Sequence, residues 1–358
     1  MEPKVTVIIL NWNGKHFLKT CFDALFKSTC RNFDVLLLDN GSEDGSVEFM
    51  KKNFKKFIGN KKLRIIASPK NLGFAGGNNE AYKHVTSKSK YVVLLNNDTK
   101  VDAEWLNETV KIAEMDDLCA GVGAIDNNIL YYKHQWNTYN LVGDPISFMQ
   151  NNRKKQTIDT TMISGCSFLF KKYLVDKPFD DDYFAYSEDM YLSWLLRLRG
   201  YNLKYATKAY FDHFTHSIKK RSKKINSFLV YHGTKNRIMN LFIFYQITNL
   251  IKIFPLIVLR ELIINIVQPA RIVSSLKAYW WLFINLGKIS KKRKHIQAKR
   301  KVSDALLIRE QSYKLYEELN ADFKMGILSK EILTLVNFLI LVYCKLLNIR
   351  TRELYQKK

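Results

Sequence analysis

The first hundred residues alternate short apolar runs with segments of helical spacing. The runs are rich in Val, Ile and Leu, and each intervening segment repeats its apolar residues every three or four positions. Strands separated by single helices are typical of an α/β fold with a doubly wound, mostly parallel sheet and right-handed crossovers. The predicted strands cover residues 5–10, 33–39, 63–67 and 91–95.

Polar residues and glycines follow each of these predicted strands. In a doubly wound sheet, ligands bind beyond the carboxyl ends of the strands. One polar loop is commonplace, but four loops rich in Asn, Asp and Gly at one sheet edge indicate a binding site. The four loops are NWNG at 11–14, DNGSEDGS at 39–46, SPKNLGFAGGNN at 68–79 and NNDT at 96–99.

Asp39 ends the second predicted strand. Its carboxylate is placed to accept the ring N–H of a pyrimidine base or a ribose hydroxyl, or else to cap a helix that begins near Asp44 or Gly45. In the third loop, the glycines between Asn71 and Asn79 permit close backbone approach, and the following helix offers N–H groups to an anion. This loop is neither a Walker A motif nor G-x-G-x-x-G, which argues against kinases and dehydrogenases.

Asp98 follows the neutral amides Asn96 and Asn97 at the end of the fourth predicted strand. Mg²⁺ and Mn²⁺ choose oxygen ligands and share their coordination with phosphates and water. A single carboxylate therefore suits a metal that arrives bound to a diphosphate. The alternative, which is compatible with this role, is that Asp98 or Thr99 caps the helix predicted over 102–115.

Two further segments carry titratable side chains. Ser187 is a predicted helix N-cap, so Glu188 and Asp189 fall in the first helical turn, where the helix dipole stabilises a carboxylate with or without a function. The functional alternative is a general base that takes a proton from an acceptor hydroxyl. His213 and His216 follow another predicted strand, and His213 is a candidate metal donor if that strand returns toward Asp98.

The composition changes near residue 217, where apolar stretches become interrupted by Lys and Arg. None reaches the ~18 apolar residues of a credible membrane span. Together with the basic run 288–301 and a net charge of +24, they predict helices lying in an anionic membrane interface, or alternatively a helical domain with a solvated basic face. We expect two domains, residues 1–216 and residues 217–358.

The five cysteines are scattered and include no C-x-x-C pair, which predicts neither a disulfide framework nor a zinc knuckle and fits a reducing, cytoplasmic setting. The apolar run before Asn11 is too short for a signal-peptide core. We therefore expect the chain at the cytoplasmic face of the cell membrane, in peripheral or monotopic attachment.

Taken together, these motifs resemble the family 2 glycosyltransferases, in particular the rhamnosyltransferase-like branch. The resemblance covers about residues 4–240 and implies a GT-A type fold with a mixed, Rossmann-like sheet. It also implies inverting transfer of a sugar from a UDP- or dTDP-linked donor to a glycan or lipid-linked acceptor in surface-glycan or glycoprotein-glycan synthesis. The motifs, in the family's order, are VTVIILNWNG, LLLDNGSEDGS, NLGFAGGNN, LLNNDT, SGCSFLF, FDDDYFAYSEDMYLSW and HFTHS.

The resemblance also implies roles for individual residues. Asp189 matches the catalytic base, with Glu188 as its neighbour, while Asp98 and His213 match ligands of Mn²⁺ or Mg²⁺. The family's D-x-D metal motif falls on residues 96–98, so only its last carboxylate is present. The residues expected to contact the nucleotide sugar are Asn11, Asp39, Asn71, Gly76, Asn78 and Asn97.

Two other classes compete with this interpretation. A non-enzymatic basic protein that binds membranes or nucleic acid, with a degenerate nucleotide fold, would show steeply salt-dependent nucleic-acid binding. No RNP-like or zinc-finger pattern supports it, so we expect no nucleic-acid partner. A nucleotidyltransferase acting on sugar phosphates would need a basic glycine-rich loop near the N-terminus, which NWNGKHFLK fits poorly.

Overall fold

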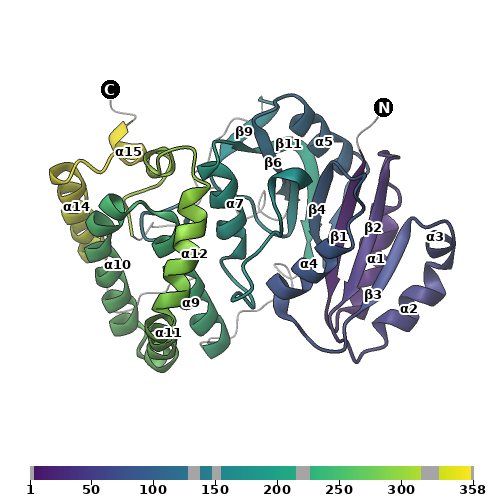
Figure 1. The fold of residues 1–358 in the computed structure, drawn as a ribbon, viewed down its shortest axis with the longest axis horizontal. Helices are drawn as coiled ribbons and strands as arrows, with labels where there is room; N and C mark the ends of the chain where they lie inside the picture. The colour runs from purple at the N-terminus through teal and green to yellow at the C-terminus, as the bar shows by residue number, and fades with distance from the viewer. Residues whose placement is uncertain (1–3, 128–137, 147–154, 215–225, 316–329, 356–358) are drawn as a thin grey trace. The chain divides into compact units, whose positions relative to one another are not determined.

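The computed structural model of the protein describes residues 4–127, 138–146, 155–214, 226–315 and 330–355 (Figure 1). The chain divides into two compact units that interleave along the sequence. Unit 1 comprises residues 1–135, 149–196 and 201–221, and unit 2 comprises residues 136–148, 197–200 and 222–358. The expected division into domains 1–216 and 217–358 stays a prediction about independent folding. His216 lies outside the described residues.

Unit 1 is built on a nine-stranded mixed sheet with the order β3-β2-β1-β4-β10-β6-β11-β5, and β9 pairs with β11. The first four predicted strands are present, each within one residue of its expected end. The strands are β1 (Val5–Asn11), β2 (Phe33–Asp39), β3 (Leu63–Ala67), β4 (Tyr91–Asn96), β5 (Thr99–Val101), β6 (Cys119–Asp126), β9 (Thr157–Thr160), β10 (Ser167–Lys171) and β11 (Asn202–His213).

Helices cover both faces of this sheet because its central strands are apolar on both faces. Val7 and Ile9 of β1 belong to the core beneath α1 and α5, while Leu10 on the opposite face lies against Gly77 of α4. The helices of unit 1 are α1 (Lys15–Leu25), α2 (Ser46–Asn53), α3 (Lys55–Gly59), α4 (Gly73–Lys83), α5 (Trp105–Glu114) and α7 (Glu188–Leu198), with a 3₁₀ turn η1 (Lys172–Leu174).

Only the β3-β2-β1-β4 side of the sheet is wholly parallel. β10 enters between β4 and β6 and is antiparallel to both, and β5 and β9 are antiparallel to β11. The mixed sheet expected from the family resemblance is therefore confirmed. The antiparallel pairing places the start of β10 beside the end of β4, where Asn96 N donates to Cys166 O at 3.1 Å. The residues just before β10 therefore lie next to the polar residues that follow β4.

Two alternative capping roles and one expected helix boundary are wrong. Asp39 does not cap α2, because its Oδ1 accepts from Ser42 N at 2.9 Å and α2 begins after Gly45 without a side-chain cap. Neither Asp98 nor Thr99 caps α5, which begins after Glu104. The glycines expected in a loop before a helix lie inside the helix itself, since α4 begins at Gly73.

Unit 2 is mainly helical, with a small hairpin of β7 (Thr138–Tyr139) and β8 (Pro145–Ile146). Across the described residues, no helix combines the length and the apolarity needed to cross a membrane. The helices are α9 (Ser227–Phe244), α10 (Ile247–Val267), α11 (Ile272–Ile284), α12 (Leu286–Ala298), α13 (Ala305–Ile308), α14 (Lys330–Leu346) and α15 (Arg352–Tyr355), with a 3₁₀ turn η2 (Pro269–Arg271).

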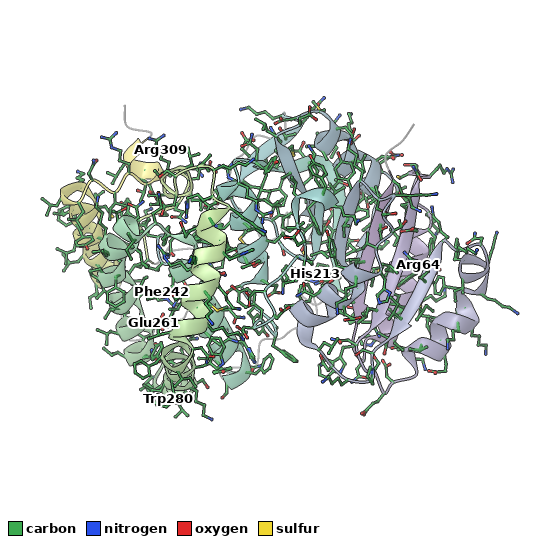
Figure 2. All side chains as sticks on the ribbon, in the orientation of Figure 1. Arg64, His213, Phe242, Glu261, Trp280 and Arg309 are labelled. Carbon is green, nitrogen blue, oxygen red and sulfur yellow. The ribbon has the colours of Figure 1, made fainter. Side chains whose placement is uncertain are left out.

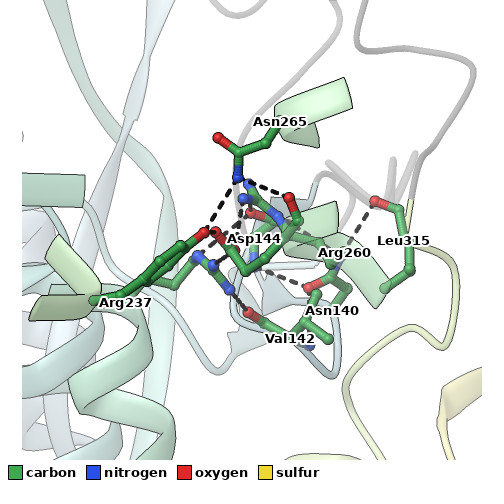
Figure 3. A network of polar contacts seen from close by, with 9 residues as sticks. Asn140, Val142, Asp144, Arg237, Arg260, Asn265 and Leu315 are labelled. Atoms are coloured by element: carbon green, nitrogen blue, oxygen red, sulfur yellow. Dashed lines mark hydrogen bonds and ion pairs between the residues drawn. The ribbon is translucent and has the colours of Figure 1, made fainter. Parts of the chain in front are cut away.

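A buried ionic network ties the hairpin segment to the helices of unit 2 (Figure 3). Arg260 of α10 donates two hydrogen bonds to Asp144, at 2.7 and 3.1 Å, and one to Glu261 at 2.9 Å. Arg237 of α9 pairs with Glu261 and also donates to Val142 O. Although burial opposes ionisation, the two guanidinium groups hold the pKa of Asp144 below its usual value.

Candidate active site

The carboxyl ends of β1, β2 and β4 meet at one edge of the sheet in unit 1. The register pairs Asn11 with Asp39 and Leu10 with Asn96, so the polar residues after these strands become neighbours. Asn11 Nδ2 donates to Asp39 Oδ2 at 3.0 Å. This bond orients one oxygen of a buried carboxylate, and the backbone of Ser42 holds the other.

The amide of Asn97 closes the same edge from the β4 side. Its Nδ2 donates to Asn11 Oδ1 at 2.7 Å, so both functional groups of Asn11 are engaged. Gly14 makes this contact possible, because a Cβ at that position would lie 2.2 Å from Asn97 Nδ2. Asn11, Asp39 and Asn97 therefore form one connected hydrogen-bonded row, as the shared sheet edge predicts.

The glycine segment is attached to this edge through Asn40, which the sequence analysis did not single out. Asn40 Nδ2 donates to Asn71 Oδ1 at 3.0 Å and to Gly73 O at 3.1 Å, and its own Oδ1 accepts from Leu72 N at 2.9 Å. The one sequence feature that could have identified Asn40 is its position directly after Asp39, at the carboxyl end of a predicted strand. Asn78 is buried in α4 and donates to Phe74 O at 2.9 Å.

Gly73 joins the start of α4 to the segment that precedes α7. It has a φ of +76°, and a Cβ there would lie 2.5 Å from Phe184 O and 2.6 Å from Phe184 Cγ. Ala75 N donates to the same Phe184 carbonyl at 3.3 Å. The expected donor-binding segment and the expected catalytic segment are thus packed directly against each other.

Asp98 and His213 are brought together by strand pairing. β5 pairs antiparallel with β11 and aligns Thr99 with His213, so the histidine lies next to the end of β4. Asp98 Oδ1 is 3.2 Å from His213 Nε2, and both side chains are buried (Figure 2 labels His213). The sequence left it open whether this strand returned to Asp98, and in the structure it does.

Asp126 is a further acidic residue at this point, and the sequence analysis did not include it. It ends β6, is 3% exposed, and its Oδ2 lies 4.0 Å from His213 Nδ1. A carboxylate on the far side of a ligating imidazole typically fixes its orientation. The available signal was the same as for Asp39, an aspartate at the carboxyl end of an apolar run.

The Asp98 and His213 pair fits a hard divalent cation. A carboxylate oxygen and an imidazole nitrogen both suit Mn²⁺ or Mg²⁺, and the two atoms already face each other. Within the described ranges, no three His, Cys, Asp or Glu side chains are arranged to hold a metal by themselves. Asp98 and His213 would share such a cation with phosphate oxygens and water.

The start of α7 carries the paired carboxylates, with both Glu188 and Asp189 in its first turn, as predicted. Tyr186 and Ser187, immediately before it, have φ angles of 71° and 63°. Consecutive non-glycine residues in the left-handed region cost free energy and are typical of functional sites. Leu192, the next apolar position on the expected buried face, is fully buried.

The two carboxylates differ in environment. Glu188 Oε2 is buried and accepts no hydrogen bond from the described residues. Burial, together with the charge of Asp189, raises the pKa of Glu188 to about 8. Asp189 Oδ1 accepts from Met190 N at 2.8 Å. At neutral pH the structure therefore favours the protonated form of Glu188.

Cys166 shows that these acidic groups converge. Burial, with smaller contributions from the negative charges of Asp126, Asp98 and Asp189, raises the pKa of its thiol to about 12. These three carboxylates come from the ends of β6 and β4 and the start of α7, and all act on one sulfur atom. The structure thus gathers on one side of the sheet carboxylates that are separated by up to ninety residues in sequence.

Comparison with known proteins agrees with this arrangement. Residues 6–179 match the family model described as Glycosyl transferase family 2. The chain is 24% identical over 217 residues to a glycosyltransferase named GlyA from Streptococcus pneumoniae serotype 4, covering 58% of this chain and 30% of that protein. An uncharacterized Bacillus subtilis glycosyltransferase named YfnE is 25% identical over 186 residues, covering 50% and 45%. The chain thus spans less than half the length of these relatives.

Two solved structures share the fold at low sequence identity. The mannosyltransferase PcManGT from Pyrobaculum calidifontis, solved with GDP-Man and Mn²⁺, superimposes with a TM-score of 0.52 at 15% identity, covering 97% of this chain and 88% of that one. GalNAc-T7, solved with UDP, GalNAc and Mn²⁺, has a TM-score of 0.55 at 12% identity, covering 68% and 48%. At these identities the likeness shows the fold, a mixed α/β sheet of the GT-A type.

Proposed function

Residues 6–179 form a family 2 glycosyltransferase domain, and on that premise we propose that the chain transfers a sugar from a UDP- or dTDP-linked donor to a hydroxyl group, with inversion at the anomeric carbon. The observation that carries the proposal is the meeting of Asp98, His213 and Asp126 at the sheet edge that also holds Asp39. A divalent cation that neutralises a diphosphate takes oxygen ligands such as carboxylates, and a carboxylate is also one of the side chains that serve as a general base.

The nucleotide would bind along the hydrogen-bonded row of Asn11, Asp39 and Asn97. The orientation of Asp39 by Asn11 and Ser42 leaves a buried acceptor for a pyrimidine ring N–H or a ribose hydroxyl. The diphosphate would lie toward Asp98, with Asn71 and Gly76 lining the donor pocket. Each polar group in this row is already positioned, so little ordering is needed when the donor binds.

Asp189 is the proposed base. The acceptor oxygen forms a bond to the anomeric carbon while the bond from that carbon to the diphosphate oxygen breaks, and the hydroxyl proton passes to Asp189. A bound Mn²⁺ or Mg²⁺ would neutralise the negative charge of the diphosphate. Asp98 and His213 would hold that cation. Asp189 would lie opposite the leaving group, and a protonated Glu188 adds no negative charge beside it.

The acceptor and the location of the protein are also proposals. We expect a glycan or lipid-linked acceptor, used in surface-glycan or glycoprotein-glycan synthesis, at the cytoplasmic face of the cell membrane. The support is the excess of cations, 57 Lys and Arg against 33 Asp and Glu, and the exposed apolar side chains of α10 and α11.

A thermal-shift screen of UDP- and dTDP-sugars with and without Mn²⁺ tests donor, metal and enzyme class together. A donor at about one hundred times its Kd adds about 2.7 kcal/mol to the free energy of unfolding, which corresponds to roughly 5–10 °C in Tm for a unit of this size. Stabilisation should need Mn²⁺. Asp98→Ala should remove the Mn²⁺-dependent part nearly completely, and Asp159→Asn, at an exposed carboxylate, is the matched control.

The base assignment has its own test. Asp189→Asn should bind donor normally and lose about 10²–10⁴-fold in kcat, the usual range for removing a general base. Near wild-type transfer by this variant would show that the base is another residue. If no nucleotide sugar stabilises the protein and nucleic acid binds with a steep salt dependence, the proposal of an enzyme is wrong and the basic binding protein replaces it.

A further inference from the structure

Helices α10 and α11 of unit 2 expose an unusual number of large apolar side chains. Along α10 the exposed residues recur every three or four positions and therefore share one face. Trp280 and Phe283 of α11 stack with ring centroids 5.8 Å apart and are 63% and 64% exposed, and Figure 2 shows Trp280 at the outer edge of its helix. The most exposed apolar side chains of these two helices include Ile251, Leu262, Ile266, Leu276, Trp280 and Phe283.

The apolar face of α10 cannot turn inward, because the opposite face is already packed. Ile253, Ile257 and Ile264 are buried inside unit 2, and Arg260 and Glu261 are held in the buried ionic network. Rotating the helix would remove two charged groups from their partners. The exposed apolar face is therefore a fixed feature of unit 2.

Helix α12 supplies positive charge directly after this face. Residues 288–301 contain eight Lys and Arg and no acidic residue. One side of α12 serves the fold, since Arg293 donates to Tyr245 O at 2.7 Å and Gln297 donates to Ile243 O at 2.8 Å at the end of α9. Lys291 and Lys294 are instead exposed.

The basic and apolar residues are close together along the chain. Leu286, which is half exposed, begins α12, and Lys291 follows it by about 7.5 Å along the helix axis. That separation is within the Debye length of about 8 Å at physiological ionic strength. A surface that accepts Leu286 therefore places Lys291 within electrostatic range of its charges, and Lys294 follows about one turn later.

We propose that α10, α11 and α12 together form a docking surface for an anionic lipid bilayer. In this surface, the apolar side chains of α10 and α11 enter the interface and the lysines of α12 contact phosphate headgroups. The proposal deepens the membrane attachment in the proposed function and rests on it, but it does not depend on the transfer reaction. Helices α10 and α11 would lie in the plane of the interface, since each has one packed face and one exposed face.

Charge complementarity selects the bilayer over a second copy of the chain. A two-fold interface brings the same surface of two molecules together, so the basic residues of α12 would approach their own copies. Such a contact between chains of net charge +24 is repulsive, whereas anionic headgroups attract the same residues. Aromatic side chains such as Trp280 also favour the boundary between water and lipid.

Vesicle co-sedimentation of the full-length chain tests this surface. The probes are phosphatidylcholine vesicles with and without phosphatidylglycerol, at low and high salt. The wild-type protein should bind anionic vesicles, and the double variant Trp280→Glu with Phe283→Glu should bind at least tenfold more weakly at any salt concentration. Lys291→Glu with Lys294→Glu should weaken binding about tenfold on anionic vesicles at low salt and have no effect on neutral ones.

Met115→Glu is the matched control. Met115 is 62% exposed at the end of α5 in unit 1 and lies outside the proposed surface, so this variant should bind like the wild type. Unchanged binding by the Trp280 and Phe283 variant would overturn the proposal. So would self-association in vesicle-free buffer that this variant disperses, if the wild type binds no vesicles, because the face would then belong to a second copy.

Donor-induced thermal stabilisation, measured on the same variants, separates this proposal from the proposed function. The expected donor site lies in unit 1, so all the surface variants should keep the stabilisation, which also shows that they are folded. If no nucleotide sugar stabilises any variant while vesicle binding follows the expected pattern, the transfer proposal fails and the membrane surface stands.

Discussion

Gly73→Ala is expected to disrupt the connection between the proposed donor-binding segment and the segment that leads into α7. The added Cβ would lie 2.5 Å from Phe184 O and 2.6 Å from Phe184 Cγ, and the residue would have to keep a φ of +76°. The side chain of Phe184 has some freedom to move. Its carbonyl has much less, because Ala75 N binds it. Relief therefore requires the backbone around Phe184 to shift.

The magnitude follows from three contributions to the free energy of unfolding. Left-handed backbone at a non-glycine residue costs about 1–2 kcal/mol, and overpacking costs about 1–3 kcal/mol. The lower entropy of the unfolded chain returns about 0.4–1 kcal/mol. The net destabilisation is about 1–4.6 kcal/mol, or a fall in Tm of roughly 2–18 °C.

Thermal unfolding followed by circular dichroism is the assay, with Gly76→Ala as the matched control for stability. Gly76 is in the same helix, its φ is not positive, and an added Cβ would lie 3.2 Å from Leu72 Cβ, so alanine should be neutral or gain up to about 1 kcal/mol in helix propensity. In Gly73→Ala, kcat should fall more than donor affinity, because Phe184 leads into the turn before Glu188. Equal stability of the two variants, with unchanged kcat, would refute this reasoning.

Three further predictions concern buried charges. Glu188→Gln should stabilise the protein by about 2–4 kcal/mol above pH 8 and by almost nothing below pH 4.5. Because the pKa of Glu188 is raised in the folded protein, the unfolded chain loses this proton first as the pH rises, so the stability of the wild type falls between these pH values. Urea unfolding at several pH values measures the difference between the two proteins. Asp126→Asn should weaken Mn²⁺ about 10–100-fold by loosening His213, which titration of donor-dependent stabilisation with Mn²⁺ would show, and an unchanged Mn²⁺ affinity would count against the contact. Arg260→Met should cost about 3–5 kcal/mol because two buried carboxylates lose a partner, whereas Arg31→Met, at an exposed arginine, should leave Tm unchanged within error.

Much of the catalytic unit followed from local patterns in the sequence. Strands β1 to β4 were placed within one residue at each end because buried parallel strands are short, apolar and rich in branched side chains. The row of Asn11 and Asp39 was also predictable, since parallel neighbours end at the same edge of a sheet. The start of α7 at Glu188 was visible from the position of Ser187 and the leucines that follow.

Other features depended on contacts that local patterns do not encode. The beginning of α4 was predicted too late in the chain, because three closely spaced glycines are typical of a loop. In the structure these glycines lie inside the helix, where Leu10 and Phe184 leave no room for a larger side chain at Gly77 and Gly73. The caps offered as alternative roles for Asp39 and Asp98 are absent for a similar reason, since both side chains contact other groups at the sheet edge.

The sequence by itself determined the fold class, the family resemblance and the residue types at the ends of the strands, because these depend on spacing within ten or twenty residues. Only the tertiary structure decided that His213 faces Asp98, since that contact is set by the register between β5 and β11, more than a hundred residues apart in sequence. It also decided that the carboxyl group of Glu188 is buried. Register and burial are properties of the assembled sheet and its packed helices, and no segment acquires them alone.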